Sequence, residues 1–346
     1  MSSDIIPAFG LDGRSPEPPS VLEWSTCWGG EPPTIEQDVR LVRGDYVVID
    51  SPAECRNLRI DEGTTLHLRR GCRLRVGTIH VRGGGTLMVD AGAEVIFAGL
   101  PFGSDDHEQY GNGLLVEGKI VVRGTLKTPF VRLASDAVPG HITLHIESQV
   151  AGWGLANELA VPPSGEADYY HRRRPTDRPT SALVERDHIV PLLWGVGATR
   201  HTAGYSADDH GSYLPHVANL TRDVVFRSEN PSGIRGHFLA TDYAEVDIEG
   251  AEFRDMGRTT DAPLGPGNHI GRYAVHLHHL HGAPRPGTDR FRLVGCAVID
   301  SKKWAIAIHD SHCGRVEGNV VCGVQHAGIV TEDGSESFNI IENNFV

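Results

Sequence analysis

The chain has 346 residues, of which 39% are hydrophobic and 22% are charged, with 41 Gly and 21 Pro. This composition predicts a turn-rich globular protein of one large or two modest domains, and it excludes a disordered chain, a collagen and a coiled coil. The formal net charge of -13 argues against a protein that binds the nucleic-acid backbone. No apolar run reaches the roughly 18 residues of a membrane helix, and no secretion signal is visible at the start.

Short strands bounded by glycine are predicted along most of the chain, whereas helical periodicity is hard to find. Strands this short, joined by brief turns, favour stacked coils or a compact sandwich over a meander of long hairpins. The six cysteines show no CxxC spacing and are expected to be buried free thiols. The predicted strands of the first half are VRLV (39–42), YVVI (46–49), NLRI (57–60), TLHL (65–68), RLRV (73–76), TIHV (78–81), TLMV (86–89) and EVIF (94–97).

Changes in composition divide the chain into four expected parts. Residues 1–22 are predicted to form an N-terminal tail, and residues 23–155 a β domain of glycine-punctuated short strands. Residues 156–218 are rich in Pro, Gly and polar residues, which is typical of a loop-rich insertion or linker. Residues 219–346 carry an internal repeat.

The repeat is clearest between AIAIHDSHCG (305–314) and GIVTEDGSES (328–337), which align at an offset of 23 residues. This offset places Ile306 on Ile329 and His309 on Glu332. An earlier copy, AVHLHHLHG (274–282), aligns with the first at an offset of 31. In the neighbouring strand, two further pairs are expected, Val298 with Val320 and Asn319 with Asn343. Repeats of this length with three short strands each predict an all-β fold, a right-handed parallel β-helix of the pectin-lyase type.

The register decides which side chains share a face, because strand side chains alternate. Val275 and Leu277 are predicted to point inward, and His276 and His278 outward. Adjacent coils lie about 4.8 Å apart, so aligned outward residues should form ladders. We expect two neighbouring ladders, His278–His309–Glu332, which Asp242 extends, and His279–Asp310–Asp333.

Such a strip of imidazoles and carboxylates suits acid–base catalysis. Repulsion between stacked Asp310 and Asp333 is expected to raise the pKa of one of them, as a general acid requires. Carboxylates about 5 Å apart match a retaining glycosidase pair, and a separation near 9.5 Å matches an inverting pair. The same strip suits a divalent metal, since His with carboxylate favours a transition metal and carboxylate alone favours calcium. Polar ladders also occur as purely structural stacks, and spacing does not separate these cases.

Five segments of the repeat region carry a family resemblance. They resemble the β-helix region shared by cell-migration-inducing hyaluronidase, its transmembrane relative and fibrocystin-like proteins. The first half, with Trp24, Trp28 and glycine-punctuated strands to about residue 100, resembles the eight-glycine domain that precedes this β-helix. The chain thereby looks like a bacterial relative or a fragment. The five segments are NLTRDVVFRSEN (219–230), AEFRDMGRT (251–259), IGRYAVHLHHLHG (270–282), KKWAIAIHDSHCG (302–314) and GIVTEDGSESFN (328–339).

The resemblance implies a secreted or cell-surface protein, with hyaluronan binding and depolymerisation in some family members and no established activity in others. Arg272, His276, His278, Glu332 and Asp333 match the recurrent motifs of the family. We therefore expect a carbohydrate-active hydrolase that acts on an acidic polysaccharide of the hyaluronan or glycosaminoglycan type by acid–base catalysis.

Roles follow for the candidate site residues. Arg272 is expected to pair with a substrate carboxylate through its planar fork. If a divalent cation binds, calcium or a transition metal, the expected ligands are His279, Asp310 and Asp333. The expected acid–base groups are His278, His309, Asp310, Glu332 and Asp333, and the expected substrate-binding groups are Arg272, Tyr273 and His276.

Two other functions remain open from the sequence. In a polysaccharide lyase or uronate epimerase, a histidine or Tyr273 would remove the proton beside the sugar carboxylate. A non-catalytic glycan-binding or adhesion module would use the ladders for stability alone. An acidic polysaccharide is the expected partner in each case, with neither nucleic acid nor membrane insertion. The open last coil predicts a partner or further chain that covers its strand edge.

Overall fold

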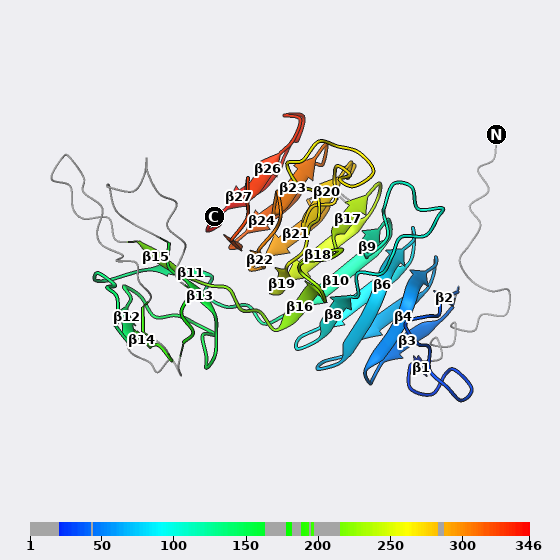
Figure 1. Ribbon diagram of the computed structural model, residues 1–346, viewed down its shortest axis with the longest axis horizontal. Coiled ribbons are helices and arrows are strands. Elements are labelled where there is room, and N and C mark those ends of the chain that lie inside the picture. Colours follow the sequence, from blue (N-terminus) through cyan, green and yellow to red (C-terminus); the bar gives the residue numbers. More distant parts are fainter. Residues whose placement is uncertain are drawn as a thin grey trace.

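The computed structural model describes residues 21–42, 44–162, 178–181, 188–193, 195–196, 215–282 and 287–346. Its regular elements are all strands, most of which pair in parallel as successive coils stack (Figure 1). The predicted right-handed parallel β-helix is confirmed. In these ranges no helix is long and apolar enough to cross a membrane.

The first face of the β-helix is a parallel sheet of nine strands, one from each coil. Its outward positions carry charged and polar side chains, and its inward positions fill the core. In spatial order the strands are β1 (Val21–Glu23), β3 (Tyr46–Ile49), β5 (Thr65–Leu68), β7 (Thr86–Asp90), β10 (Lys119–Arg123), β18 (Glu245–Glu249), β21 (Phe291–Val294), β24 (Gly314–Glu317) and β27 (Ile340–Glu342).

The other two faces belong to one sheet of thirteen strands that two long strands hold together, β4 (Ala53–Ile60) and β6 (Arg73–Val81). The first half of β6 pairs with the second face and its last residues with the third. The second face comprises β8 (Glu94–Phe97), β16 (Val224–Ser228), β19 (Ala251–Arg254), β22 (Ala297–Ile299) and β25 (Val320–Cys322). The third, called here the site face, comprises β2 (Val39–Leu41), β9 (Gly113–Val116), β17 (Phe238–Thr241), β20 (Val275–His278), β23 (Ile306–His309) and β26 (Ile329–Thr331).

One coil contains a long insertion. The chain leaves the β-helix after β10 and returns at β16, which pairs directly with β8, so the stack of coils continues without a gap. The described part of the insertion forms small antiparallel sheets over a separate apolar core that includes Leu133, Leu144 and Trp153. Its strands are β11 (Phe130–Arg132), β12 (Thr143–His145), β13 (Leu159–Ala160), β14 (Ile189–Pro191) and β15 (His216–Asn219).

Both parts of the chain that were expected to be separate β domains contribute strands to the same two long sheets. Strand β10 lies between β7 and β18, which joins residues 23–155 to residues 219–346 in one solenoid. Of the expected tail and insertion, residues 1–20, 163–177, 182–187, 194 and 197–214 lie outside the described residues. The exact domain boundaries stay a prediction.

The predicted register is right on the site face and wrong by one residue elsewhere. Ile306 pairs with Ile329, and Val275 pairs with Ile306, as the offsets of 23 and 31 predict. On the second face, however, Val298 pairs with Val321 and not with Val320.

The predicted asparagine stack is also shifted. The amide of Asn319 stacks on Asn344, with Nδ2 to Oδ1 at 3.0 Å, and not on Asn343. The shift arises earlier, because paired residues are 23 apart at Ile306–Ile329 and 25 apart at Arg315–Ile340, so the turn between β26 and β27 is two residues longer than the turn between β23 and β24. Asn343, with φ of 52°, matches Gly318, with φ of 64°, in the turn that follows.

All six cysteines are free thiols. Cys55, Cys296 and Cys322 are buried as expected, but Cys27, Cys72 and Cys313 are partly exposed because they lie in the turns between strands.

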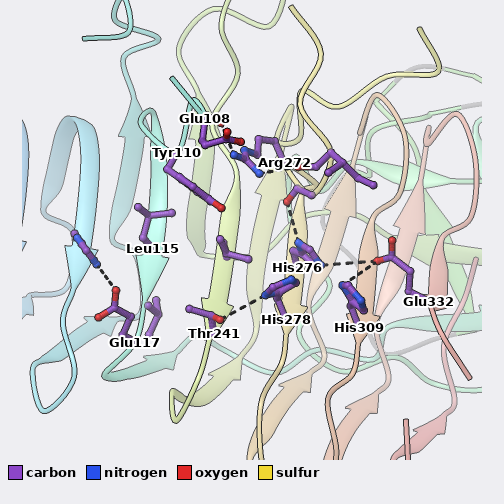
Figure 2. Close-up of a pocket in the computed structure, with 15 residues that line it drawn as sticks. Glu108, Tyr110, Leu115, Glu117, Thr241, Arg272, His276, His278, His309 and Glu332 are labelled. Carbon is purple, nitrogen blue, oxygen red and sulfur yellow. Dashed lines mark hydrogen bonds and ion pairs between the residues drawn. The ribbon is translucent and has the colours of Figure 1, made fainter. Parts of the chain in front are cut away.

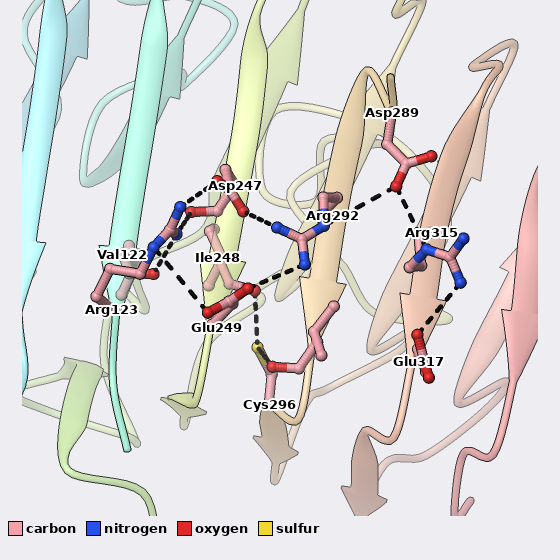
Figure 3. Close-up of polar contacts among 11 residues, drawn as sticks. Val122, Arg123, Asp247, Ile248, Glu249, Asp289, Arg292, Cys296, Arg315 and Glu317 are labelled. Carbon is pink, nitrogen blue, oxygen red and sulfur yellow. Dashed lines mark hydrogen bonds and ion pairs between the residues drawn. The ribbon is translucent and has the colours of Figure 1, made fainter. Parts of the chain in front are cut away.

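A charged network covers the first face across four coils (Figure 3). Arg292 on β21 donates from Nη1 to Asp247 and from Nη2 to Glu249, both at 2.9 Å. Arg123 on β10 also contacts Asp247, and Arg315 on β24 contacts Glu317 at 3.3 Å. Arg315 stacks directly on Arg292, and Asp289 offsets this like charge, at 3.9 Å from Arg292 Nε and 3.3 Å from Arg315 Nε.

Replacing Arg292 by alanine is expected to lower the free energy of unfolding by about 1 kcal/mol, because partly exposed ion pairs contribute about that much. The loss should shrink in high salt, which screens these charges. Urea unfolding followed by circular dichroism at two salt concentrations measures both. R292K, which keeps the charge without the planar fork, should lose less. A loss that does not depend on salt would assign the effect to packing instead.

Candidate functional site

A groove with a volume of about 590 Å³ crosses the site face from β6 to β23 (Figure 2). Its floor consists of outward side chains from successive coils, including His80, Leu239 and His278. Two loops border it: residues 98–112, which precede β9, and residues 255–274, which precede β20. The groove is therefore built by repeated strands below and by coil-specific loops at its rim.

Two buried arginines hold the loops together. Arg272 donates to the carbonyls of Ile270 at 2.7 Å and of Glu108, and its guanidinium lies 4.1 Å from the centre of the Tyr110 ring. Arg258 donates to the carbonyls of Gly111 at 2.9 Å and of Gln109. Burial lowers the pKa of Arg258 to about 9 and also lowers that of Arg272. Arg272 borders the groove, but much of its fork already binds backbone oxygens.

The first predicted ladder exists, with one correction at its start. Thr241 pairs with His278, which pairs with His309, and Glu332 follows directly in the next coil. Asp242 does not extend this ladder; it lies one position later, level with His279. The residue that precedes His278 in the ladder is therefore Thr241, whose hydroxyl lies 3.5 Å from His278 Nδ1.

The residues of the second predicted ladder lie where the backbone turns at the end of each strand. Asp242, His279 and Asp310 all adopt a positive φ, of 60°, 53° and 42°, where the chain turns away from the site face. Asp and His are among the residues enriched in this left-handed conformation. His279, Asp310, and Asp333 from the next coil are not among the residues that line the groove. The repulsion expected to raise a pKa is absent at Asp310, since a hydrogen bond from Ser335 lowers the pKa of that carboxyl.

His276 points outward from β20, as expected, but it is only 3% exposed because the preceding loop covers it. Its Nδ1 lies 2.9 Å from the carbonyl oxygen of Gly271. The ring of Tyr273 packs against it at 5.0 Å and against Trp304 at 4.7 Å. Tyr273 is buried, burial raises its pKa, and it does not line the groove.

Glu332 joins the two neighbouring histidines. Its Oε2 lies 3.9 Å from His276 Nε2 and 3.7 Å from His309 Nδ1. The other ring nitrogen of His309, Nε2, lies 2.8 Å from a carboxylate oxygen of Asp333. The structure thus brings His276, His309, Glu332 and Asp333 together, with His278 beside them at a ring distance of 4.9 Å from His309.

Burial displaces the pKa values in this cluster. It lowers the pKa of His276 to about 3 and that of His278 to about 4, because a charged imidazole loses its hydration there. The pKa of Glu332 is raised for the same reason. Burial therefore favours the neutral form of the His276 and His278 rings.

Two sets of side chains in the described part of the chain bring three ligand atoms within 4.8 Å of one another. One is His276, His309 and Glu332; the other is His278, His279 and His309. Neither is the expected set of His279, Asp310 and Asp333.

The sequence did not reveal several residues of the groove. Glu108 and Tyr110 come from the loop before β9, which lies outside the repeat. Arg258 holds this loop but does not line the groove. His80 and Glu117 were accessible in principle, because TIHV (78–81) repeats the alternation of the histidine strand. Their side chains meet at 3.0 Å at the far end of the groove.

One family model matches the C-terminal part of the chain. The CEMIP beta-helix family matches residues 233–346, which include β20, β23, β26 and the whole imidazole–carboxylate cluster. The resemblance predicted from the histidine motif is thus confirmed.

Relatives match most of the chain at low identity. Mouse fibrocystin-L is 25% identical over 93% of this chain, and human fibrocystin-L 24% over 93%. A G8 domain-containing protein of Dictyostelium discoideum is 24% identical over 87% of the chain. The chain spans only 8% of the length of each fibrocystin-L and 25% of the Dictyostelium protein.

Among solved structures, two phage tailspikes resemble the fold. The tailspike of Acinetobacter baumannii bacteriophage AP22, in complex with capsular saccharide, is 11% identical with a TM-score of 0.24, and the match covers 78% of this chain and 41% of that one. The tailspike of Pseudomonas phage phi297 is 12% identical with a TM-score of 0.26, covering 81% and 40%.

Proposed function

We propose that the chain binds an acidic polysaccharide along the groove of the site face and hydrolyses it at the cluster of His276, His278, His309 and Glu332. The observation that carries the proposal is the position of this partly buried imidazole–carboxylate cluster in the floor of a groove that crosses several coils. Successive coils repeat every ~4.8 Å, so an extended polymer can contact several of them at once.

The resemblance to hyaluronan-depolymerising proteins supports an acidic sugar polymer as the substrate class. Arg272 at the rim and the imidazoles of the floor are the groups that would meet the substrate carboxylates. A location outside the cell, at its surface or beyond, belongs to the same proposal, since such polymers occur there.

His278 is the proton-transfer group in this proposal. It faces the groove, and its neighbours His276 and His309 are both turned toward Glu332. The oxygen of a water molecule bonds to the anomeric carbon while the bond from that carbon to the glycosidic oxygen breaks. His278 takes a proton from the water and passes one to the departing oxygen, so one water is consumed and the enzyme is unchanged. Thr241 orients the ring through Nδ1.

The test is incubation of hyaluronan, chondroitin, alginate and pectate with the full chain, with and without a divalent metal, followed by size-exclusion chromatography. We expect at least one polymer to become shorter, with no ultraviolet absorbance from unsaturated uronate. Replacing His278 by glutamine should slow the shortening by roughly 10²- to 10⁴-fold, as for loss of a proton-transfer group.

The matched control is H145Q, which removes an exposed imidazole on β12 in the insertion and should cleave at the wild-type rate. Shortening with unsaturated-uronate absorbance would replace the hydrolase with a lyase. Saturable binding of a polymer that keeps its length would replace it with a glycan-binding module.

A further inference from the structure

We propose that His276 Nε2, His309 Nδ1 and Glu332 Oε2 bind a divalent transition-metal ion at the floor of the groove. The proposal concerns binding alone and does not depend on the proposed hydrolysis. It assigns a ligand set that differs from the carboxylate-rich turn positions His279, Asp310 and Asp333.

The partners of the two rings decide which ring nitrogens carry hydrogen. His276 Nδ1 faces the carbonyl oxygen of Gly271 at 2.9 Å, and a carbonyl only accepts, so Nδ1 holds the hydrogen. His309 Nε2 faces the carboxylate of Asp333 at 2.8 Å, so Nε2 is the donor there. In the neutral rings, the lone pairs are therefore on His276 Nε2 and His309 Nδ1, the two atoms that face Glu332.

The space between these atoms is bordered by hydrogen-bond acceptors. Three acceptors converge, two imidazole lone pairs and one carboxylate oxygen, with all three atoms within 4.8 Å of one another. His276 Nε2 and Glu332 Oε2 are buried, and neither has a hydrogen-bond partner in the described structure. Converging buried acceptors without a donor cost free energy. A cation among them removes that cost.

The distances between the three atoms can be compared with those around a zinc ion. Bonds from zinc to His nitrogen and carboxylate oxygen are about 2.0–2.1 Å, which places tetrahedral ligand atoms about 3.4 Å apart. The two measured separations from Glu332 Oε2 are 3.9 and 3.7 Å. Rotation of the Glu332 side chain, which follows the last residue of β26, can shorten both separations, and the two ring nitrogens lie within 4.8 Å of each other.

Each of the two rings also has a partner for its second nitrogen, the one that faces away from Glu332. Ligating histidines usually donate their second ring N–H to a carboxylate or a backbone carbonyl, which fixes the ring and its tautomer. His309 has the carboxylate of Asp333 and His276 the carbonyl of Gly271 in these places. Two imidazoles with one carboxylate select a transition ion over calcium, and all three ligands line the groove, which leaves a position for water.

The second group of close histidines, His278, His279 and His309, lacks these features. Its rings stack, with 3.9 Å between the centroids of His278 and His279, and it contains no carboxylate. His278 is oriented by Thr241 instead. It stays available beside the ion, so that a metal-held water would lie next to the proton-transfer group.

Zinc titration of the metal-stripped full chain, by isothermal calorimetry and by metal analysis after dialysis, tests the proposal without any substrate. We expect one tightly bound zinc per chain and much weaker binding of calcium. Cobalt bound at the same site should show the visible absorption of a low-coordinate ion with nitrogen ligands.

Variants identify the ligands. E332Q and H309Q should each weaken zinc binding by at least about 100-fold, and D333N by about 10- to 100-fold as an outer partner. H279Q and D310N, which alter the turn positions, should bind as the wild type does. Circular dichroism and thermal unfolding confirm that each variant folds.

Two results would overturn the proposal: a wild-type chain that takes up no zinc, or an E332Q chain that takes it up equally well. Loss of binding in H279Q or D310N with E332Q unaffected would assign the ion to the turn positions instead. Tight zinc binding with no polymer cleavage would sustain the metal site and contradict the hydrolase. Cleavage that survives metal removal would sustain the hydrolase, whereas the zinc titration alone decides the metal site.

Discussion

Replacing Glu332 by glutamine is expected to slow polysaccharide cleavage by about 10²- to 10³-fold, the loss found when one charge-stabilising group is removed from a reaction centre. The effect should fall on kcat, because Glu332 lies at the reacting end of the floor and the rim residues that hold the polymer are unchanged.

The same substitution should leave the protein at least as stable as the wild type. In E332Q the amide can donate to His276 Nε2, a buried atom that has no partner in the described structure. The substitution also removes a carboxylate whose pKa is raised by burial. A residue that holds the coils together would show the opposite result, since breaking a structural ladder lowers stability.

The measurement is initial cleavage rate together with thermal unfolding, for E332Q and for E317Q as a control on the first face of the β-helix. E317Q should retain the wild-type rate. An E332Q protein that unfolds at a lower temperature and still cleaves at the wild-type rate would make the cluster a structural feature of the stack.

The largest effect on stability is expected at Phe253. Its side chain is 1% exposed, stacks on Phe226 with 5.2 Å between ring centroids, and contacts Phe238 at 6.1 Å. Truncating a buried phenylalanine to alanine costs about 3–5 kcal/mol. Because each coil is stabilised by its neighbours, the loss weakens the coils on both sides of β19, including β20 with its histidines.

Urea unfolding of F253A, followed by circular dichroism, measures this loss. F253L, which keeps much of the volume, should lose less than half as much. Y243A provides the exposed aromatic control and should change stability by no more than about 0.5 kcal/mol. A loss below about 1 kcal/mol in F253A would mean that the core can collapse around the cavity.

Much of the fold follows from the sequence because a coil repeat constrains register strongly. Apolar residues such as Ile306 and Ile308 must point inward in every coil, so one alignment fixes the outward neighbours His278 and His309. The register slips between β26 and β27, where the turn is two residues longer than in the coil before and nothing in the apolar pattern marks it.

The site is harder to predict from the sequence than the fold, because loops form part of it. His276 alternates outward like His278, yet the loop before β20 buries it and turns its lone pair toward Glu332. That loop is held by contacts of Arg272 with Glu108, which lies 164 residues earlier. A repeat alignment contains no information about such contacts. The sequence therefore pointed to the turn residues His279, Asp310 and Asp333 as metal ligands.

The account is tested most directly by the chain length of hyaluronan after incubation with the zinc-loaded full chain and with E332Q under the same conditions. We predict progressive shortening by the wild type and almost none by E332Q, at equal folded concentration. Equal shortening by both proteins would remove the cluster from catalysis, and intact hyaluronan with the wild type would contradict the proposed activity on this polymer.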